Sequence, residues 1–527
     1  MDLNQLLIWM ISFSCGINLI RALAQGYQLQ QALVLIPGLV LGITLGGTWL
    51  VPDIAGLVGG CFWILLLVLP SLLFRKVGEL ISTEHYPEAD SLVHSFHWIY
   101  RLYQLRWYPH LVRALALAAS KDTAAAENIL CNYQQSTTVP TPWEQMVIVA
   151  LYRVMGTWNP LLNWAQPLML QPQQRHDPSL VLAYLRALGE TGDLNSLLQA
   201  YDTWRGGLEQ AENPTLLRLA QLFVLAFTGQ MVTVEKLLKQ DLNHLPDPVK
   251  QFWGATSLWA GGLPELAQTQ LQSLLDTHPS LSPSLQKGIQ QRLSRIAPSS
   301  DQILTPNSRQ ILFHLSQTLS HSEPMPVLDV NWIASRPTLA LMSLNILVFG
   351  CQLWWGGESQ TEALLRLGAL AVPNVLAGEW WRLITANVLH SGPLHLLLNV
   401  LALLILGPFV ETSLGAGRYL LLYWGAGVGS MAILTLLQVT QLSELALVVG
   451  ASACIMGLLG ATAAILLHLW RQTHSPVALR RLRSILLIIL LQTIFDLSVP
   501  QISVMGHLSG LVIGFGLGTL LNRSRRT

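Results

Sequence analysis

Apolar stretches of membrane-spanning length lie at the two ends of the chain and are missing from its middle. A helix needs about 20 apolar residues to cross the hydrocarbon layer of a bilayer, which is roughly 30 Å thick. Stretches near that length cover residues 5–22, 31–51 and 54–74, and later 336–354, 393–410, 418–438, 446–469, 484–499 and 503–521. The pattern predicts an all-α, polytopic membrane protein with three N-terminal spans and a C-terminal six-helix bundle.

Residues 85–295 instead show the spacing of amphipathic helices. Four segments share an apolar helix, a glycine turn and a second apolar helix. The turn glycines Gly156, Gly192, Gly229 and Gly262 are 36, 37 and 33 residues apart, and Ser120-Lys121 marks an earlier turn. A period near 34 residues resembles tetratricopeptide repeats, which stack into a solenoid with a concave surface. The resemblance implies a soluble, solenoid-like domain that binds a protein partner, and an ordinary helical spacer is the alternative.

These patterns divide the chain into five parts. They are an N-terminal transmembrane region at 1–76, soluble helical repeats at 85–295, a linker at 296–335, the six-span bundle at 336–521 and a basic cytoplasmic tail at 522–527. The first apolar stretch lacks a basic leading segment and carries Asp2, so a cleavable signal peptide is not expected. An alternative for the N-terminal region is that the second and third apolar stretches form one hydrophobic hairpin that does not fully cross the membrane.

Composition agrees with a membrane protein. Hydrophobic residues make up 51% of the 527, charged residues only 11%, and the mean hydropathy is +0.45. Soluble domains carry about 25% charged residues. A net charge of +1 argues against a nucleic-acid partner. The cysteines show neither metal-ligand spacing nor a disulfide framework, so we expect no metal and no cofactor. They are Cys15, Cys61, Cys131, Cys351 and Cys454.

The distribution of charges between the apolar stretches predicts the topology, because cytoplasmic loops are rich in Lys and Arg. Arg75-Lys76 follow the third stretch and place the repeat domain in the cytoplasm. In the bundle, basic residues collect after the second, fourth and sixth spans, at Arg418, Arg471, Arg480, Arg481, Arg483, Arg523, Arg525 and Arg526. The remaining loops or their edges carry Glu358, Glu362, Glu379, Glu444 and Asp496. We therefore expect an integral, multi-pass protein of a bacterial plasma membrane.

Four polar side chains of the types used in catalysis lie inside the apolar spans, where they are costly unless they pair or face water. His395 and Asn399 fall in the first turns of the second span, Ser452 a few residues into the fourth, and His507 a few residues into the sixth. These three spans run from outside to inside in the predicted topology. At 1.5 Å per residue, all four side chains lie on the order of 10 Å below the outer surface. The sequence therefore predicts one polar site in the outer third of the bilayer.

Two stripes of small residues would bring the site together. Gly510 and Gly514 continue the helix face of His507, and Gly457 belongs to a second stripe beside Ser452. Such stripes let helix backbones approach closely in a membrane. We expect the fourth and sixth spans to pack through them.

The residue types at this level suit nucleophilic catalysis. Ser452 could hydrogen-bond His507 as nucleophile and base, and an adjacent helix N-terminus would stabilise an oxyanion. His395 and Asn399 are four residues apart, so they lie on one helix face and could donate to the same oxygen. Asp496 lies at the edge of the fifth loop and is not an obvious third member. A Ser452–His507 dyad is the expected arrangement.

At this point four motifs resemble those of rhomboid intramembrane serine proteases, and the resemblance covers residues 336–521. "EWWRLITANVLHSGPLHLLLN" contains Trp381, Arg382, His390, His395 and Asn399; "GPFVETSLGAGR" contains Gly407, Glu411 and Gly415; "GASACIMGLLGA" contains Gly450, Ser452 and Gly457; and "GHLSGLVIG" contains His507, Gly510 and Gly514.

The resemblance implies hydrolysis of peptide bonds in or beside the transmembrane helices of membrane-protein substrates. Ser452 would be the nucleophile, His507 the general base, and the oxyanion would meet His395, Asn399 and the Ser452 N–H. Supporting positions would be His390, Trp381, Arg382, Glu411, Gly450, Gly457, Gly510 and Gly514. Purely structural alternatives exist: an interfacial anchor for Trp381-Arg382, a loop anchor for His390, and a cytoplasmic turn for Glu411.

One position departs from the family pattern, because Ala453 stands where the family usually has glycine. Alanine should be tolerated unless the position needs a positive φ. Two other functions stay open: a rhomboid-like pseudoprotease that binds transmembrane clients without cleaving them, and a membrane-anchored scaffold built around the repeat domain.

Overall fold

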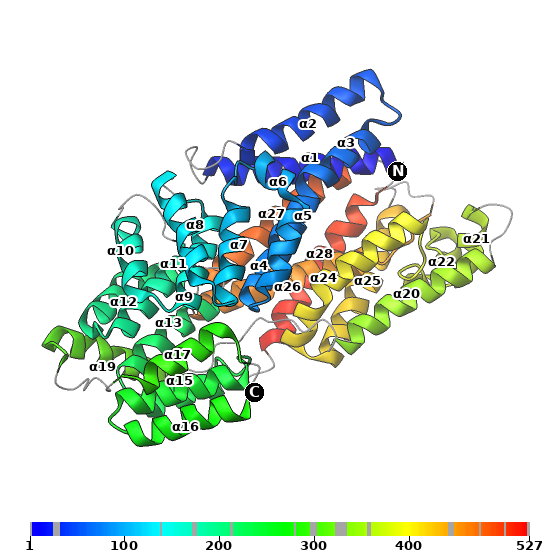
Figure 1. Cartoon of the computed structure of the whole chain (residues 1–527). Helices are drawn as coiled ribbons and strands as arrows, with labels where there is room; N and C mark the ends of the chain where they lie inside the picture. Colours follow the sequence, from blue (N-terminus) through cyan, green and yellow to red (C-terminus); the bar gives the residue numbers. More distant parts are fainter. Residues whose placement is uncertain are drawn as a thin grey trace. The chain divides into compact units, whose positions relative to one another are not determined.

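A computed structural model gives the structure of the chain (Figure 1). It describes residues 3–24, 32–136, 140–170, 177–210, 214–278, 281–295, 303–321, 335–355, 360–440, 447–473, 476–499 and 502–523. Much of the predicted linker and most of the predicted tail, with Arg525 and Arg526, lie outside the described residues, as do Glu358 and Glu444. The chain forms two compact units, Met1–Pro326 and Val327–Thr527. Both are built from helices, which confirms the all-α class.

The first unit begins with helices at the three N-terminal apolar stretches. They are α1 (Leu3–Ala24), α2 (Ala32–Leu50) and one continuous helix made of α3 (Ala55–Trp63), the π-helical η1 (Ile64–Val68) and α4 (Leu69–Ser82). Both α2 and the continuous helix are long and apolar enough to cross a membrane, whereas the apolar part of α1 is shorter, Asn4–Ile20. That all three N-terminal helices cross the membrane therefore stays a prediction.

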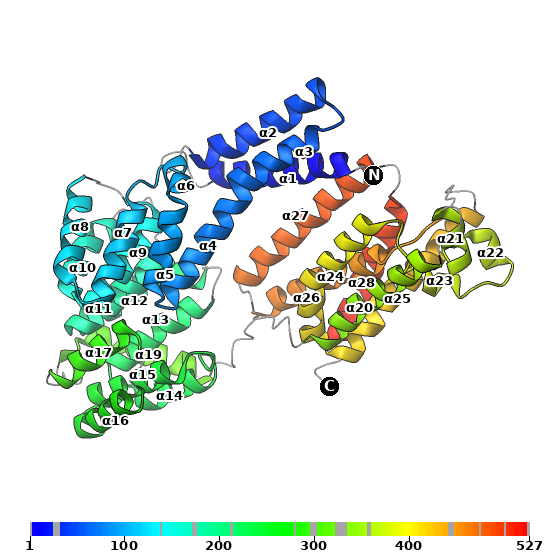
Figure 2. The same ribbon diagram turned by 45° about the vertical axis from the view of Figure 1, so that its right-hand side comes forward.

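The continuous helix enters the core of the helical repeats. Pro70 has no N–H, so the Leu66 carbonyl four residues earlier lacks its helical donor. The Tyr103 hydroxyl donates to that carbonyl oxygen at 2.7 Å. One turn further, the Phe74 ring stacks on Trp143, with ring centroids 5.0 Å apart. Helix α4 therefore runs past the predicted boundary at residue 76, and its last turns belong to the repeat core (Figure 2).

Pairs of helices follow in the first unit. They are α5 (Tyr86–Ser95), α6 (His97–Leu102), α7 (Tyr108–Ala119), α8 (Thr123–Ser136), α9 (Pro142–Met155), α10 (Trp158–Met169), α11 (Pro178–Thr191), α12 (Leu194–Glu209), α13 (Pro214–Phe227), α14 (Met231–Lys239), α15 (Asp247–Ala260), α16 (Pro264–Thr277), α17 (Pro283–Leu293) and α19 (Pro306–His321). Gly156, Gly192, Gly229 and Gly262 have φ of 69°, 86°, 75° and 86°, and Lys121 has φ of 72°. Glycine adopts this left-handed region at little cost. The chain thus turns where the sequence period places the turns, while the tetratricopeptide assignment stays a prediction.

Helix α17 packs back against α11, α13 and the turn after α9. Arg292 of α17 donates to Glu190 of α11 at 2.5 Å, and its guanidinium lies 5.1 Å from the ring centroid of Phe227 on α13. Gln291 donates to the Gly156 carbonyl after α9 at 2.9 Å. A solenoid usually offers this surface to a partner. Here a helix of the same chain covers part of it.

The second unit contains the predicted bundle. Its helices are α20 (Arg336–Trp354), α21 (Gln360–Leu367), α22 (Val372–Leu376), α23 (Arg382–Thr385), α24 (Pro393–Leu414), α25 (Ala416–Val439), α26 (Ser452–Thr473), α27 (Pro476–Ser498) and α28 (Val504–Arg523). Among the described residues, α20, α24, α25, α26 and α28 are long and apolar enough to cross a membrane. The predicted fifth span lies in α27, which is not among these helices; Arg480, Arg481 and Arg483 occupy its first turns.

Candidate active site

Ser452 is the first residue of α26, the most buried of the membrane-length helices. The fourth span was predicted to begin at residue 446, but the preceding chain is extended. Leu370 and Val448 form an isolated β-bridge, and Gly450, with φ of 131°, donates its N–H to the Ala386 carbonyl at 2.8 Å. Because α26 starts at Ser452, the N–H groups of its first turn have no partner within the helix. Ser452 therefore lies at a helix end with free backbone donors.

His395 lies directly against this turn. A Cβ atom placed on Gly450 would be 2.9 Å from Nε2 of His395 and 3.6 Å from Oγ of Ser452. The Ser391 N–H donates to Nδ1 of His395 at 3.5 Å, and an amide N–H can only donate. In that tautomer Nδ1 is the acceptor and Nε2 carries the hydrogen. The His395 N–H therefore faces the segment that holds Ser452.

Asn399 follows one turn later on α24 and is buried. Its Nδ2 has no hydrogen-bond partner. A buried amide N–H without an acceptor is costly, and such groups call for an explanation such as a catalytic role. Asn399 thus supplies an unused donor on the same helix as His395.

His390 is fully buried before α24, and neither of its ring nitrogens has a hydrogen-bond partner. Its ring packs edge-on against His395, with centroids 5.2 Å apart. Gln352 of α20 donates to the His390 carbonyl at 2.6 Å and accepts its N–H at 3.2 Å. His390 therefore supports the His395 ring from a clamped backbone.

His507 pairs with an acid that the sequence interpretation set aside. Nδ1 of His507 lies 2.8 Å from Oδ2 of Asp496, and the Asp496 side chain is only 3% exposed. Gln492, one turn earlier on α27, donates to the other carboxylate oxygen at 2.8 Å. Asp496 was placed at a loop edge, but α27 continues to Ser498 and carries it inside the bundle. The placement of Asp496 at a loop edge was wrong, and the sequence signal for it was a charge within an apolar run, whereas the dyad itself stays a prediction.

The two stripes of small residues join α26 to α28. A Cβ atom on Gly510 would collide with the Ala453 carbonyl, and one on Gly514 would collide with the backbone of Gly457. Close backbone packing therefore sets the serine and histidine helices side by side. Within the described residues, no hydrogen bond joins the Ser452 hydroxyl to His507. Catalytic hydrogen bonds often form fully only when substrate is bound.

Leucine at Gly514 is expected to destabilise the second unit, because the new side chain meets backbone atoms that cannot rotate away. Overpacking of this kind costs about 1–3 kcal/mol or more. Leucine at Gly516 is the matched control, since a Cβ there meets no atom within 4 Å. Thermal unfolding in detergent should show a lower Tm for G514L and an unchanged Tm for G516L. Equal values would contradict the observed packing.

Arg382 organises the loop before α24. Its guanidinium donates to Glu379 at 2.5 Å and to the carbonyls of Leu365 and Ala369 at 2.8 and 2.9 Å. It also lies 4.8 Å from the ring centroid of Trp381. The Arg382 hydrogen bond lowers the pKa of Glu379. Trp381 and Arg382 thus stabilise the loop, and their supporting role in catalysis stays a prediction.

Glu411 also has a structural position. It accepts the N–H and the hydroxyl of Thr338 at 3.1 and 2.7 Å, and the Tyr419 hydroxyl lies 3.1 Å from the same Thr338 oxygen. These bonds connect α20, α24 and α25. No cluster of three His, Cys, Asp or Glu side chains that could hold a metal occurs in the part of the chain that the structure describes.

Comparison with known proteins agrees with this architecture. The profile of the Rhomboid domain family matches residues 377–524. The chain is 37% identical over 180 residues to "Rhomboid protease GluP" of Bacillus subtilis, covering 34% of this chain and 33% of the relative. It is 36% identical over 162 residues to "RHOMBOID-like protein 6, mitochondrial" of Arabidopsis thaliana, covering 31% and 50%.

A third relative, YdcA of Bacillus subtilis, whose name marks it as a candidate rhomboid protease, is 36% identical over 151 residues, covering 28% of this chain and 70% of the relative. The chain is therefore an integral membrane protein of the rhomboid family, as its motifs predicted. It covers about a third of the length of the first relative and about half of the length of the second.

Proposed function

We propose that the chain is a serine endopeptidase that cleaves membrane proteins in or near their transmembrane helices. The observation that carries the proposal is the grouping of Ser452, a helix N-terminus and the His395 ring around Gly450. The unused Nδ2 of Asn399 and the neighbouring His507 on α28 support it. The protease names of relatives in the same family point the same way.

In the proposed mechanism, the Ser452 hydroxyl attacks the carbonyl carbon of the scissile bond. His507 takes the hydroxyl proton on Nε2, while Asp496 accepts the Nδ1–H and keeps Nε2 free as a base. The oxyanion is stabilised by the first-turn N–H groups of α26, by Nε2–H of His395 and by Nδ2 of Asn399. Collapse breaks the C–N bond as His507 returns the proton to the leaving amine. Water then hydrolyses the acyl-enzyme by the same steps.

The substrates we propose are single-pass proteins with Gly, Ala or Ser near the outer end of the helix. An extended chain must reach Ser452, and breaking helical hydrogen bonds is costly in lipid. We further propose a bacterial plasma membrane with the repeat domain in the cytoplasm, where it recruits a protein partner.

Ala453 does not favour the pseudoprotease alternative. It lies in the first turn of α26, and the residues with positive φ in the described chain do not include it. The methyl group is therefore accommodated in ordinary helical backbone, without the strain that would require glycine.

Fluorophosphonate labelling of the detergent-solubilised protein tests the proposal without a known substrate. We expect the wild type to label and S452A not to label, because only an activated serine reacts at an appreciable rate. A folded wild type that does not label would instead support a pseudoprotease or scaffold.

A further inference from the structure

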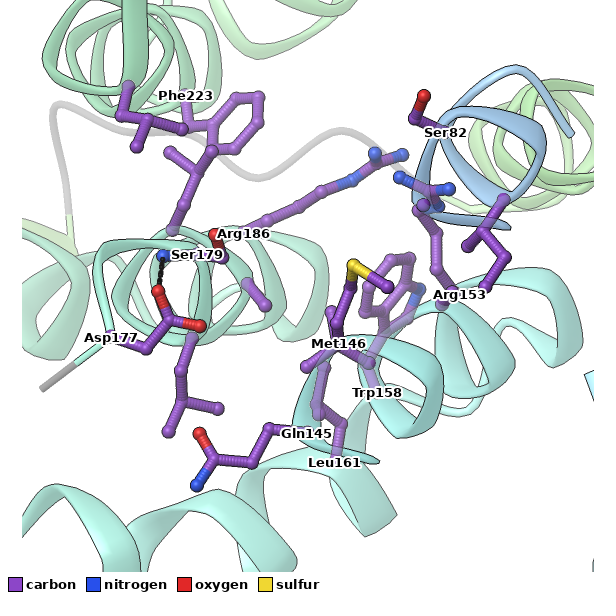
Figure 3. A pocket seen from close by; sticks show the side chains of 18 residues that line it. Ser82, Gln145, Met146, Arg153, Trp158, Leu161, Asp177, Ser179, Arg186 and Phe223 are labelled. Carbon is purple, nitrogen blue, oxygen red and sulfur yellow. Dashed lines mark hydrogen bonds between the residues drawn. The ribbon is translucent and has the colours of Figure 1, made fainter. Parts of the chain in front are cut away.

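A pocket of about 220 Å³ opens in the repeat domain between α9 and α11 (Figure 3). Trp158 and Leu161 of α10 line it, and the last turns of α4 and part of α13 contribute to its walls. It lies beside the surface that α17 covers, and no residue of α17 lines it. The pocket is thus a separate, open part of the solenoid surface.

Two arginines project into one end of the pocket, and each is paired with a carboxylate only at long distance. The Nε atoms of Arg153 and Arg186 are buried and have no hydrogen-bond partner. The closest carboxylates are those of Glu84, 3.9 Å from Nη2 of Arg153, and Glu190, 3.5 Å from Nε of Arg186. Glu190 is also bonded to Arg292. Three guanidinium groups therefore share two carboxylates, which leaves one positive charge in excess.

Aromatic rings hold Arg186 in place. Its guanidinium lies 5.3 Å from the ring centroids of both Trp158 and Trp253. Burial lowers the pKa of Arg186 to about 10, although the nearby Glu190 raises it. The side chain is thus cationic at neutral pH, poorly hydrated and preorganised. An anion would satisfy it at little entropic cost.

The other end of the pocket has a different chemistry. Asp177 lies there, with one oxygen accepting the Ser179 N–H at 3.1 Å, and Gln145 lies beside it (Figure 3). Apolar side chains, among them Met146 and Leu161, line the space between this end and the arginines. A matching ligand has a carboxylate at one end, an apolar group in the middle and an N–H donor at the other end.

We infer that this pocket binds the C-terminal residue of a protein chain. The α-carboxylate would lie between Arg153 and Arg186, the apolar side chain against Met146 and Leu161, and the amide N–H would point toward Asp177. The volume is below the roughly 300–1,000 Å³ of pockets for drug-sized ligands, which suits a single residue. An internal Asp or Glu has no apolar group to fill the walls. A phosphate group brings more charge than the single excess positive charge balances.

The test uses the full-length protein in detergent with the S452A background, so that no probe is cleaved. Isothermal titration calorimetry would compare N-acetyl-Leu-Leu carrying a free carboxylate with the same dipeptide as its amide. We expect the acid to bind and the amide to bind at least about tenfold more weakly, because the charge-assisted hydrogen bonds are lost. Equal affinities would overturn the inference. So would equally tight binding of 4-methylpentanoic acid, which would identify a small carboxylic acid as the ligand.

Two pairs of variants locate the site. R153Q should weaken binding of the acid about tenfold or more, whereas R205Q, which alters an exposed ion pair on α12, should not. Leucine at Gly78, which lines the pocket and whose Cβ would meet no atom within 4 Å, should block binding without lowering Tm. Gly206→Leu is its control, at an equally open helix position on α12. Undiminished binding by folded G78L would overturn the proposal, even if R153Q failed to fold.

Discussion

S452A is expected to abolish proteolysis, and H507A is expected to lower kcat by about 10⁴-fold or more. Without Ser452 no acyl-enzyme forms. Without His507 no group is placed to take the hydroxyl proton, since the ring that faces Ser452 from α24 is a donor on Nε2. The two residues act as one unit, so the S452A/H507A double variant should be no slower than the slower single variant.

Cleavage of a reporter with a Gly- and Ala-containing transmembrane helix, reconstituted in liposomes, measures this effect. H468A and S413A are matched controls, because His468 bonds Gln472 within α26 and Ser413 bonds the Phe409 carbonyl within α24. Both controls should cleave at the wild-type rate. Cleavage by folded S452A would show that another group is the nucleophile and would remove the basis for the proposed mechanism.

The predictions from sequence succeeded where they depended on local periodicity. His395 and Asn399 share a helix face because they are four residues apart, and Gly510 and Gly514 meet α26 because a small-residue stripe permits close packing. The turn glycines of the repeats could be found because a positive φ restricts the residue type. In each case, the residues that determine the structural feature lie close together in the sequence.

The errors concern helix ends and contacts between distant segments. The start of α26 at Ser452 depends on pairing of residue 448 with residue 370, which hydropathy does not reveal. The burial of Asp496 within the bundle depends on a partner for its carboxylate, and that partner is His507. The return of α17 over the repeats likewise depends on the contact between Arg292 and Glu190. Tertiary contacts stabilise these features, and a single sequence does not show which residues will meet.

Asn at position 496 is expected to lower kcat by at least about a hundredfold and to leave KM nearly unchanged. The Asp496 carboxylate can only accept, so it fixes the His507 tautomer with hydrogen on Nδ1 and the base on Nε2. An asparagine can present its NH₂ group to Nδ1 instead, which would place the hydrogen on Nε2 and remove the base. Asp496 acts through His507 and is a positioning residue.

A merely structural role for Asp496 would give a different set of results. In that case D496N would lower Tm and yield, while the folded fraction would retain its kcat. Glutamate at 496 keeps an acceptor-only carboxylate and should recover part of kcat, which a defect in packing would not allow. Gln492→Leu is the matched control on the same helix: it removes the bond to Oδ1 of Asp496 but leaves Oδ2 on His507. Its loss of kcat should be much smaller than that of D496N. If D496N and Q492L had the same kcat as the wild type, His507 would work without Asp496, and the dyad first expected from the sequence would be the correct description.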